Sequence, residues 1–274
     1  LSTLHSPLSN LQSVRKVIFM SDWNAALYSK FEKDRTLPSY DLVRAVDIRP
    51  KTVLDIGCGI GNSTAVLAEH FPEAHIVGAD NSPDMLAHAR RTHPSLEFIE
   101  LDAAHGLPNV TERYDLVFSN ACVQWLPDHK TILPQMLGLL NDGGVLAVQM
   151  PQQAKHPMHK LLRETARSPK WTAKIPSLRQ YHMLTEEAYF DLLAANSSSF
   201  RMWEVTYYHE MPSHESIVEW YKGTGLRPYL DQLSEADKPL FEADVLARVR
   251  ELYPVQENGS IIFRFPRLFF TAVK

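Results

Sequence analysis

The segment Asp55-Ile56-Gly57-Cys58-Gly59-Ile60-Gly61-Asn62 is the part of the sequence whose residue types and spacing most clearly indicate chemistry. It follows a short apolar run and opens an amphipathic stretch, so backbone amides and a helix start would meet a ligand at the carboxyl end of a sheet. A dinucleotide fingerprint requires its third glycine where this chain has Asn62. The turn therefore predicts a nucleotide-like ligand, and the dinucleotide interpretation fails by one residue.

Two carboxylates lie near this turn in the predicted fold. Asp55 precedes the first glycine by two residues, and Asp80 ends the next apolar run. The Asp55 carboxylate would repel a pyrophosphate and suits a positively charged group, such as the amino end of S-adenosylmethionine. Asp80 lies where an acid can accept hydrogen bonds from two ribose hydroxyls, a role shared by nicotinamide and methionine cofactors. The simpler alternatives are a structural turn and, for Asp80, part of a helix cap.

Repeated β-α units must position these residues, because short apolar runs alternate with amphipathic stretches from Thr52 onwards. The predicted strands are 52–56, 75–79, 96–100, 114–118 and 144–150, and the predicted helices between them are 62–70, 82–91 and 131–140. Later helices are predicted over 156–168, 185–194, 215–223 and 235–253, and later strands over 200–209 and 261–273. We expect one α/β domain over 20–274, with 212–254 as a helical substrate cap. Residues 1–19 lack a steady period and are expected to be a disordered extension.

Composition narrows the functional class. The chain has 274 residues, with 28 basic against 32 acidic residues and a net charge of -4, which favours neither a nucleic-acid backbone nor an anionic membrane as a partner. Cys58 and Cys122 are too few for a disulfide framework. No His or Cys spacing resembles a zinc site, so no metal is expected. We expect a cytoplasmic enzyme; the oligomeric state is left open.

The ordered motifs carry a family resemblance. Asp55 with its three glycines, then Asp80, then Asp102 after the third predicted strand, resemble the motifs of class I S-adenosylmethionine-dependent methyltransferases. More narrowly, residues 20–274 resemble the trans-aconitate 2-methyltransferase family. This narrower resemblance rests on segments that include Ser21-Asp22-Trp23-Asn24, Gln124-Trp125-Leu126-Pro127-Asp128-His129, Thr224-Gly225-Leu226-Arg227-Pro228 and Tyr253-Pro254-x-Gln256-Glu257-Asn258-Gly259. Two departures are Ile60, where the family has proline, and Gln152-Gln153, where it has Asp-Asn on what would be a substrate wall.

The resemblance implies a Rossmann-like α/β sheet, mostly parallel with a terminal antiparallel strand, and a helical cap. It implies S-adenosylmethionine as the cofactor and a small polycarboxylate as the partner, with trans-aconitate converted to its monomethyl ester. The residues expected to bind the cofactor are Tyr28, Arg35, Asp55, Gly57, Gly59, Asn62, Asp80, Asn81, Met85, Asp102, Ala103 and Asn120. Positioning is expected from Asn120, Gln124 and Trp125, and substrate binding from Arg227, His209, Tyr207 and Trp125.

The chemistry explains why no catalytic side chain is predicted. A carboxylate acceptor, with a pKa near 4, is ionised at neutral pH and needs no general base. Binding a polyanion with a protein of net charge -4 requires local donors, for which Arg227 is the first candidate. Alternation along a strand places Tyr207 and His209 on one face. For Arg227 a solvent-facing position, and for His209 a structural role, are the open alternatives.

Three other functions compete with this hypothesis. A carboxyl methyltransferase for another small or carrier-bound acid is disfavoured by the family-specific segments after residue 200. A nicotinamide-dependent oxidoreductase is disfavoured by Asn62 and Asp55. A non-catalytic cofactor-binding module is harder to exclude, because methyl transfer needs no diagnostic catalytic side chain.

Overall fold

A single mixed sheet organises the part of the chain that the computed structural model describes, which comprises residues 32–153, 155–178, 182–222 and 224–274. The expectations for residues 1–19 and for Tyr28 lie outside these residues. The elements are α2 (Glu32–Arg44), β1 (Thr52–Ile56), α3 (Asn62–His70), β2 (His75–Asp80), α4 (Pro83–Thr92), β3 (Glu97–Glu100), η1 (Leu107–Asn109), β4 (Tyr114–Asn120), η2 (Val123–Trp125), α5 (His129–Gly138), β5 (Leu140–Pro151), α6 (Pro157–Ala166), α7 (Glu186–Asn196), β6 (Ser199–Met211), α8 (His214–Lys222), α9 (Arg227–Leu230), α10 (Lys238–Leu252) and β7 (Ile261–Val273).

The strand order is β3-β2-β1-β4-β5-β7-β6. Strands β1 to β5 pair in parallel, whereas β7 runs antiparallel to both β5 and β6. This confirms the expected sheet, mostly parallel with a terminal antiparallel strand. The order reverses between β1 and β4, and ligands of open α/β sheets bind beyond the carboxyl ends of strands at such a point.

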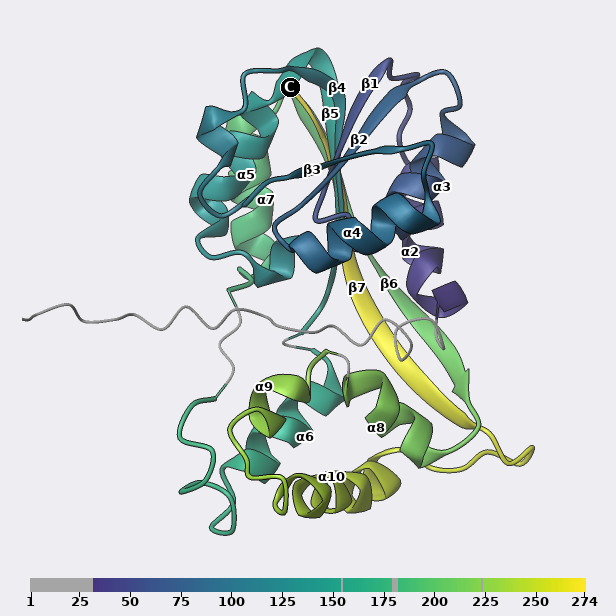
Figure 1. Cartoon of the computed structure of the whole chain (residues 1–274), viewed down its shortest axis with the longest axis vertical. Helices are drawn as coiled ribbons and strands as arrows, with labels where there is room; N and C mark the ends of the chain where they lie inside the picture. Colours follow the sequence, from purple (N-terminus) through teal and green to yellow (C-terminus); the bar gives the residue numbers. More distant parts are fainter. Residues whose placement is uncertain (1–31, 154, 179–181, 223) are drawn as a thin grey trace, which may run out of the picture.

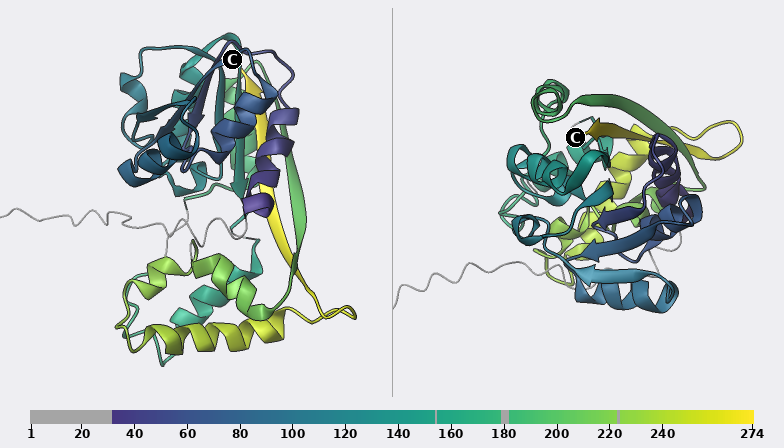
Figure 2. Two further views of the ribbon diagram at one scale, coloured as in Figure 1. Left: turned by 45° about the vertical axis from the view of Figure 1, so that its right-hand side comes forward. Right: turned by 90° about the horizontal axis from the view of Figure 1, so that it is seen from above.

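Helices cover both faces of the sheet. Figure 1 and Figure 2 show α2 and α3 on one side and α5 and α7 on the other. The central strands β1, β2, β4 and β5 are apolar along most of their length because both of their faces are buried, as parallel sheets require. On the α5 side Leu146 and Val148 are fully buried, and on the α2 side Phe118 and Phe269 are. These two cores fix the carboxyl edge of the sheet in place.

The last two strands form a hairpin that reaches beyond the sheet. β6 pairs with β7 over its whole length, but β5 pairs only with residues 267–273 of β7. The remaining part of the hairpin extends to a second layer made of α6, α8, α9 and α10 (Figure 1). Phe241, Phe263 and Trp171 are fully buried in the core of this cap. Helices α8, α9 and α10 lie between the hairpin strands in the chain, and α6, which precedes β6, packs with them.

Most predicted elements lie where the pattern placed them, and β1 and α3 have the predicted bounds. Helix α5 instead begins two residues earlier and ends at Gly138, because Leu139 and Leu140 are buried in the sheet core and Leu140 already opens β5. Helix α2, which contains Pro38, and the four-residue α9 were not predicted. Among the described residues, no helix combines the length and apolar character needed to cross a membrane.

Candidate active site

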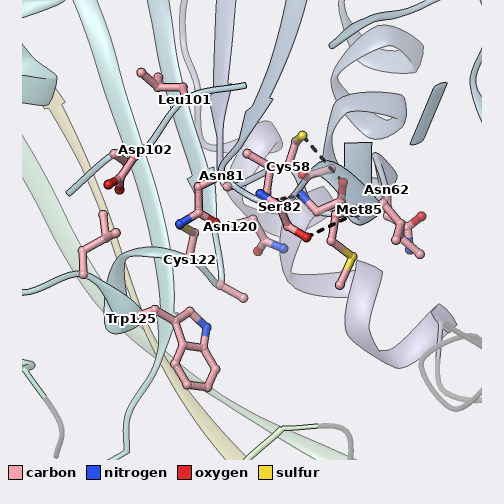
Figure 3. Close-up of a pocket in the computed structure, with 18 of the residues that line it drawn as sticks. Cys58, Asn62, Asn81, Ser82, Met85, Leu101, Asp102, Asn120, Cys122 and Trp125 are labelled. Atoms are coloured by element: carbon pink, nitrogen blue, oxygen red, sulfur yellow. Dashed lines mark hydrogen bonds between the residues drawn. The ribbon is translucent and has the colours of Figure 1, made fainter. Parts of the chain in front are cut away.

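A cavity of about 300 Å³ opens at the carboxyl ends of β1, β2, β3 and β4 (Figure 3). This volume is at the lower end of the range for small-molecule sites. The residues that line it are Thr36, Ser39, Gly57, Cys58, Gly59, Ile60, Asn62, Ser63, Asp80, Asn81, Ser82, Met85, Leu101, Asp102, Ala103, Ala104, Asn120, Ala121, Cys122, Trp125, Leu126 and Pro127.

The glycine turn forms one wall, and each of its three glycines has a positive φ: +75° at Gly57, +55° at Gly59 and +93° at Gly61. A Cβ on Gly57 would lie 2.1 Å from the Sγ of Cys122, so only glycine fits there. A Cβ on Gly59 would meet no protein atom within 4 Å. Since Gly59 lines the cavity, the space beside it is open to a ligand.

Asp80, at the end of β2, links the glycine turn to helix α4. Its two carboxylate oxygens accept hydrogen bonds from the backbone N–H of Gly59 and of Ser82, each at 2.9 Å. Burial raises the pKa of Asp80, and these N–H donors act in the opposite direction. Each oxygen retains a further lone pair, so the carboxylate can still accept a hydrogen bond from a hydroxyl in the cavity.

Asp55 lies behind the glycine turn and is fully buried. One of its oxygens, Oδ2, accepts hydrogen bonds from the hydroxyls of Ser63 and Thr64 at 2.6 and 2.7 Å. Burial raises the pKa of Asp55 to about 6, against the lowering effect of these hydroxyls. The side chain does not line the cavity, so the structure places it where it holds the turn to the first turn of α3.

Asp102 and Asn120 provide polar groups on the other walls. Asp102 accepts hydrogen bonds from the backbone N–H of Ala104 and from His105, which hold its pKa below the usual range although burial acts against them. The Oδ1 of Asn120 is buried and has no hydrogen-bond partner within the described chain. Met85 adds apolar surface to the same cavity (Figure 3).

Two cysteines line the cavity. Burial raises the pKa of Cys122 to about 12, and burial also raises the pKa of Cys58. Both side chains are therefore neutral thiols at neutral pH and serve as small apolar surface rather than as nucleophiles.

The positioning candidates occupy two different places. Asn120 and Trp125 line the cavity, but Gln124 lies behind its wall. The amide nitrogen of Gln124 donates a hydrogen bond of 2.6 Å to the carbonyl of Ala121, a residue with a φ of +56°. Gln124 therefore supports a strained turn at the cavity wall instead of facing a ligand.

None of the substrate candidates apart from Trp125 lines the cavity. The hydroxyl of Tyr207 donates a 2.6 Å hydrogen bond to Asp41 of α2, and its ring stacks 6.0 Å from that of His209, which confirms that the two share a face. His209 is buried at the junction with the cap. Arg227 begins α9, where its Nε lies 3.6 Å from Asp231.

Helix α2 supplies a wall that the sequence prediction missed. Thr36 and Ser39 line the cavity, and the hydroxyl oxygen of Ser39 is buried without a hydrogen-bond partner within the described chain. Arg35 belongs to the same helix, although its side chain is not described. The internal proline and polar composition of α2 left no periodic signal to reveal it. In the described ranges no cluster of three or more His, Cys, Asp or Glu residues could hold a metal ion.

Comparison with solved structures supports the fold. The chain is similar to the YcgJ protein from Bacillus subtilis, at 15% identity and a TM-score of 0.53, with 87% of this chain and 98% of that chain covered. It is also similar to Haemonchus contortus phosphoethanolamine N-methyltransferase 2 in complex with S-adenosyl-L-methionine, at 19% identity and a TM-score of 0.53, with 87% of this chain and 52% of that chain covered.

Comparison with characterised sequences is more specific. Residues 53–144 match the model of a methyltransferase domain family. The chain is 43% identical over 254 residues to trans-aconitate 2-methyltransferase of Shigella flexneri serotype 5b and of Escherichia coli strain K12, with 92% of this chain and 98% of each relative covered. The match includes the cap as well as the sheet. The chain therefore belongs to the trans-aconitate 2-methyltransferase family of S-adenosylmethionine-dependent enzymes.

Proposed function

We propose that the chain methylates one carboxylate of trans-aconitate and releases its monomethyl ester. The observation that carries this proposal is the 43% identity to trans-aconitate 2-methyltransferases across 98% of their length. A generic methyltransferase domain would match only in the region that holds the cofactor. Here the likeness continues through the cap and the hairpin.

The cavity residues fit S-adenosylmethionine. Open space beside Gly59 leaves room for the ligand, Asp80 retains acceptor capacity for ribose hydroxyls, and the buried Oδ1 of Asn120 has no partner within the described chain. Asn62, Asn81, Met85, Asp102 and Ala103 also line the wall, as proposed cofactor contacts. When bound, this cofactor supplies a methyl group already activated by its sulfonium.

The protein's task is then to hold an acceptor carboxylate in line with that group. Correct placement of two reactants can contribute roughly 7–11 kcal/mol toward the barrier. Asn120 and Trp125 are proposed to position the acceptor, because both line the cavity. No base is required, since the acceptor carboxylate is ionised at neutral pH.

The experiment is a screen of acceptors with radiolabelled S-adenosylmethionine. The purified chain is incubated with trans-aconitate, other small polycarboxylates, monocarboxylates and a carrier-bound acid, and label in the product is counted. The proposal requires trans-aconitate to have the highest kcat/KM of the panel. A higher value for a monocarboxylate or a carrier-bound acid would assign the chain another acceptor, and label in none of them would refute carboxyl methylation.

A further inference from the structure

A row of polar side chains crosses the carboxyl edge of the sheet beyond the cavity. Asn120 of β4 pairs with Gln149 of β5, and the Oε1 of Gln149 accepts a hydrogen bond of 3.3 Å from Arg267 of β7. Asn120 lines the cavity. Neighbouring strands lie about 4.8 Å apart, so Arg267 stands on a strand about 10 Å from that of Asn120. The row thus leads from the cavity toward the hairpin and the cap.

Gln149 and Arg267 both carry hydrogen-bond donors in an interior position. Gln149 is 0% exposed, and its Nε2 has no hydrogen-bond partner within the described chain. Arg267 is 4% exposed, and its guanidinium carbon lies 4.6 Å from the centre of the Phe265 ring. Packing against an aromatic ring and the Gln149 amide fixes the direction of the guanidinium, which is the planar fork that best pairs with a carboxylate.

The surroundings of Arg267 are rich in imidazole and phenol groups at the junction with the cap. His156 lies within hydrogen-bond reach of the Tyr221 hydroxyl at 3.2 Å, and its ring is 4.6 Å from that of Phe265. Burial lowers the pKa of His156 well below its ordinary value, and the charges of His159, Arg267 and His209 act in the same direction.

The carboxylate of Asp41, in α2, faces this region. Asp41 accepts the 2.6 Å hydrogen bond from the Tyr207 hydroxyl and lies 3.6 Å from Arg44, so it is already engaged. The positive charge of Arg267 also acts on Tyr207. An anion beside Tyr207 or His156 would therefore meet a positive field from Arg267.

We propose that Arg267, together with the Gln149 amide, anchors a carboxylate of the polycarboxylate acceptor that is not methylated, while the reacting carboxylate lies beside Asn120. This inference rests on the proposed function and names the recognition residues within it. Arg267 acts as a specificity residue: it binds a remote carboxylate and does not contact the transferred methyl group.

Arg267 suits this role better than Arg227. The Arg227 side chain is 24% exposed and its Nε lies 3.6 Å from the carboxylate of Asp231, which weakens its attraction for another anion. Arg267 is buried, so its hydrogen bonds to an anion are screened less by water. Arg267 of β7 pairs with Pro151 of β5 inside the sheet, whereas Arg227 belongs to the short helix α9.

The test compares Arg267→Gln, Arg267→Lys and Gln149→Met with the wild-type chain. Arg264→Gln is the matched control, because Arg264 lies on the same strand but is exposed beside Tyr208. The acceptors are trans-aconitate and the dicarboxylates that lack each one of its carboxylates in turn. Calorimetric titration with S-adenosylhomocysteine shows whether each variant keeps a folded cofactor site.

We expect Arg267→Gln to lower kcat/KM for trans-aconitate by about ten- to hundredfold, mainly through KM, because a charge-assisted contact is lost. Arg267→Lys should lose nearly as much, since lysine lacks the fork. The dicarboxylate that lacks the anchored carboxylate should be insensitive to all three substitutions, which a purely structural arginine would not produce. S-Adenosylhomocysteine affinity should stay at the wild-type value.

Equal losses of kcat/KM for trans-aconitate and every dicarboxylate would overturn the inference. It would also be overturned if Arg267→Lys and Gln149→Met distinguished trans-aconitate from the dicarboxylates as well as the wild type does. These two variants decide the question if Arg267→Gln fails to fold. If the wild-type chain methylates no polycarboxylate, the proposed function itself fails. An active wild-type enzyme whose selectivity does not change when Arg267 is replaced would instead refute only the inference about Arg267.

Discussion

Gly59 and Gly143 offer a matched pair for testing whether the cavity holds the cofactor. Both have a positive φ, +55° and +76°, and a Cβ on either would meet no protein atom within 4 Å. Gly59 lines the cavity, whereas Gly143 is exposed near the start of β5. Alanine at either position must adopt a left-handed backbone, but only alanine at Gly59 adds a methyl group to the ligand's space.

The cost of the left-handed backbone and the cost of filling the ligand's space can be estimated separately. The left-handed backbone costs an alanine roughly 1–2 kcal/mol, so both variants should lose a few degrees of melting temperature. Overpacking of a well-filled site costs about 1–3 kcal/mol. Gly59→Ala should therefore bind S-adenosylhomocysteine about 5- to 150-fold more weakly than the wild type, and Gly143→Ala should bind it normally.

The assay is calorimetric titration of each variant with S-adenosylhomocysteine, together with thermal unfolding in its absence. Similar melting temperatures with divergent affinities would support the placement of the cofactor beside the glycine turn. If Gly59→Ala and Gly143→Ala bind S-adenosylhomocysteine equally well, the ligand does not occupy the space beside Gly59 and the placement is refuted.

Three further predictions follow from single side chains. Asp80→Asn should weaken S-adenosylhomocysteine binding at least tenfold in calorimetry, because charge-assisted hydrogen bonds become neutral ones, whereas the exposed Asp84→Asn should not. The carboxyl of Asp55, with its pKa raised to about 6, binds more protons when folded than when unfolded, so it lowers the free energy of unfolding as pH rises from about 4 to 6. Denaturant titrations should show Asp55→Asn gaining about 2 kcal/mol relative to the wild type across that interval, and a constant difference would contradict the assignment. Arg227→Ala should raise KM for the acceptor less than Arg267→Gln does, because Arg227 already faces Asp231; a larger rise would make Arg227 the principal anchor.

The sequence predicts the sheet well because its signals are local. The apolar run 52–56, the glycine turn and the following amphipathic stretch have unambiguous periods, so β1 and α3 have the predicted bounds. Asp80, at the end of β2, reaches the cavity because parallel strands bring their carboxyl ends to one edge. The positions of these residues follow from the order and direction of the strands, which the apolar periodicity of the sequence indicates directly.

The sequence pattern indicates the strand on which a carboxylate lies more directly than the direction in which its side chain points. Asp55 and Asp80 both lie at strand ends, yet only Asp80 lines the cavity, since Ser63 and Thr64 hold the Asp55 side chain behind the turn. That contact depends on how α3 packs on the sheet. Local sequence pattern does not specify such a packing arrangement.

The acceptor side of the site depends on long-range contacts. Gln149 and Arg267 are separated by 118 positions in the chain and meet only because β7 pairs with β5. One signal was present, since Arg267 places a charge within the otherwise apolar run 265–270. A cation inside a strand that is buried on both faces marks a position where packing alone does not explain the residue.

Stoichiometric ester formation is the most direct test of the central claim. The purified chain is incubated with trans-aconitate and labelled S-adenosylmethionine, and the product is identified by mass spectrometry and by its lability to mild alkali. Our account predicts one monomethyl ester for each S-adenosylhomocysteine formed, with the label released as methanol by alkali. S-Adenosylhomocysteine formation without an alkali-labile product, or methyl transfer to an atom other than a carboxylate oxygen, would contradict it.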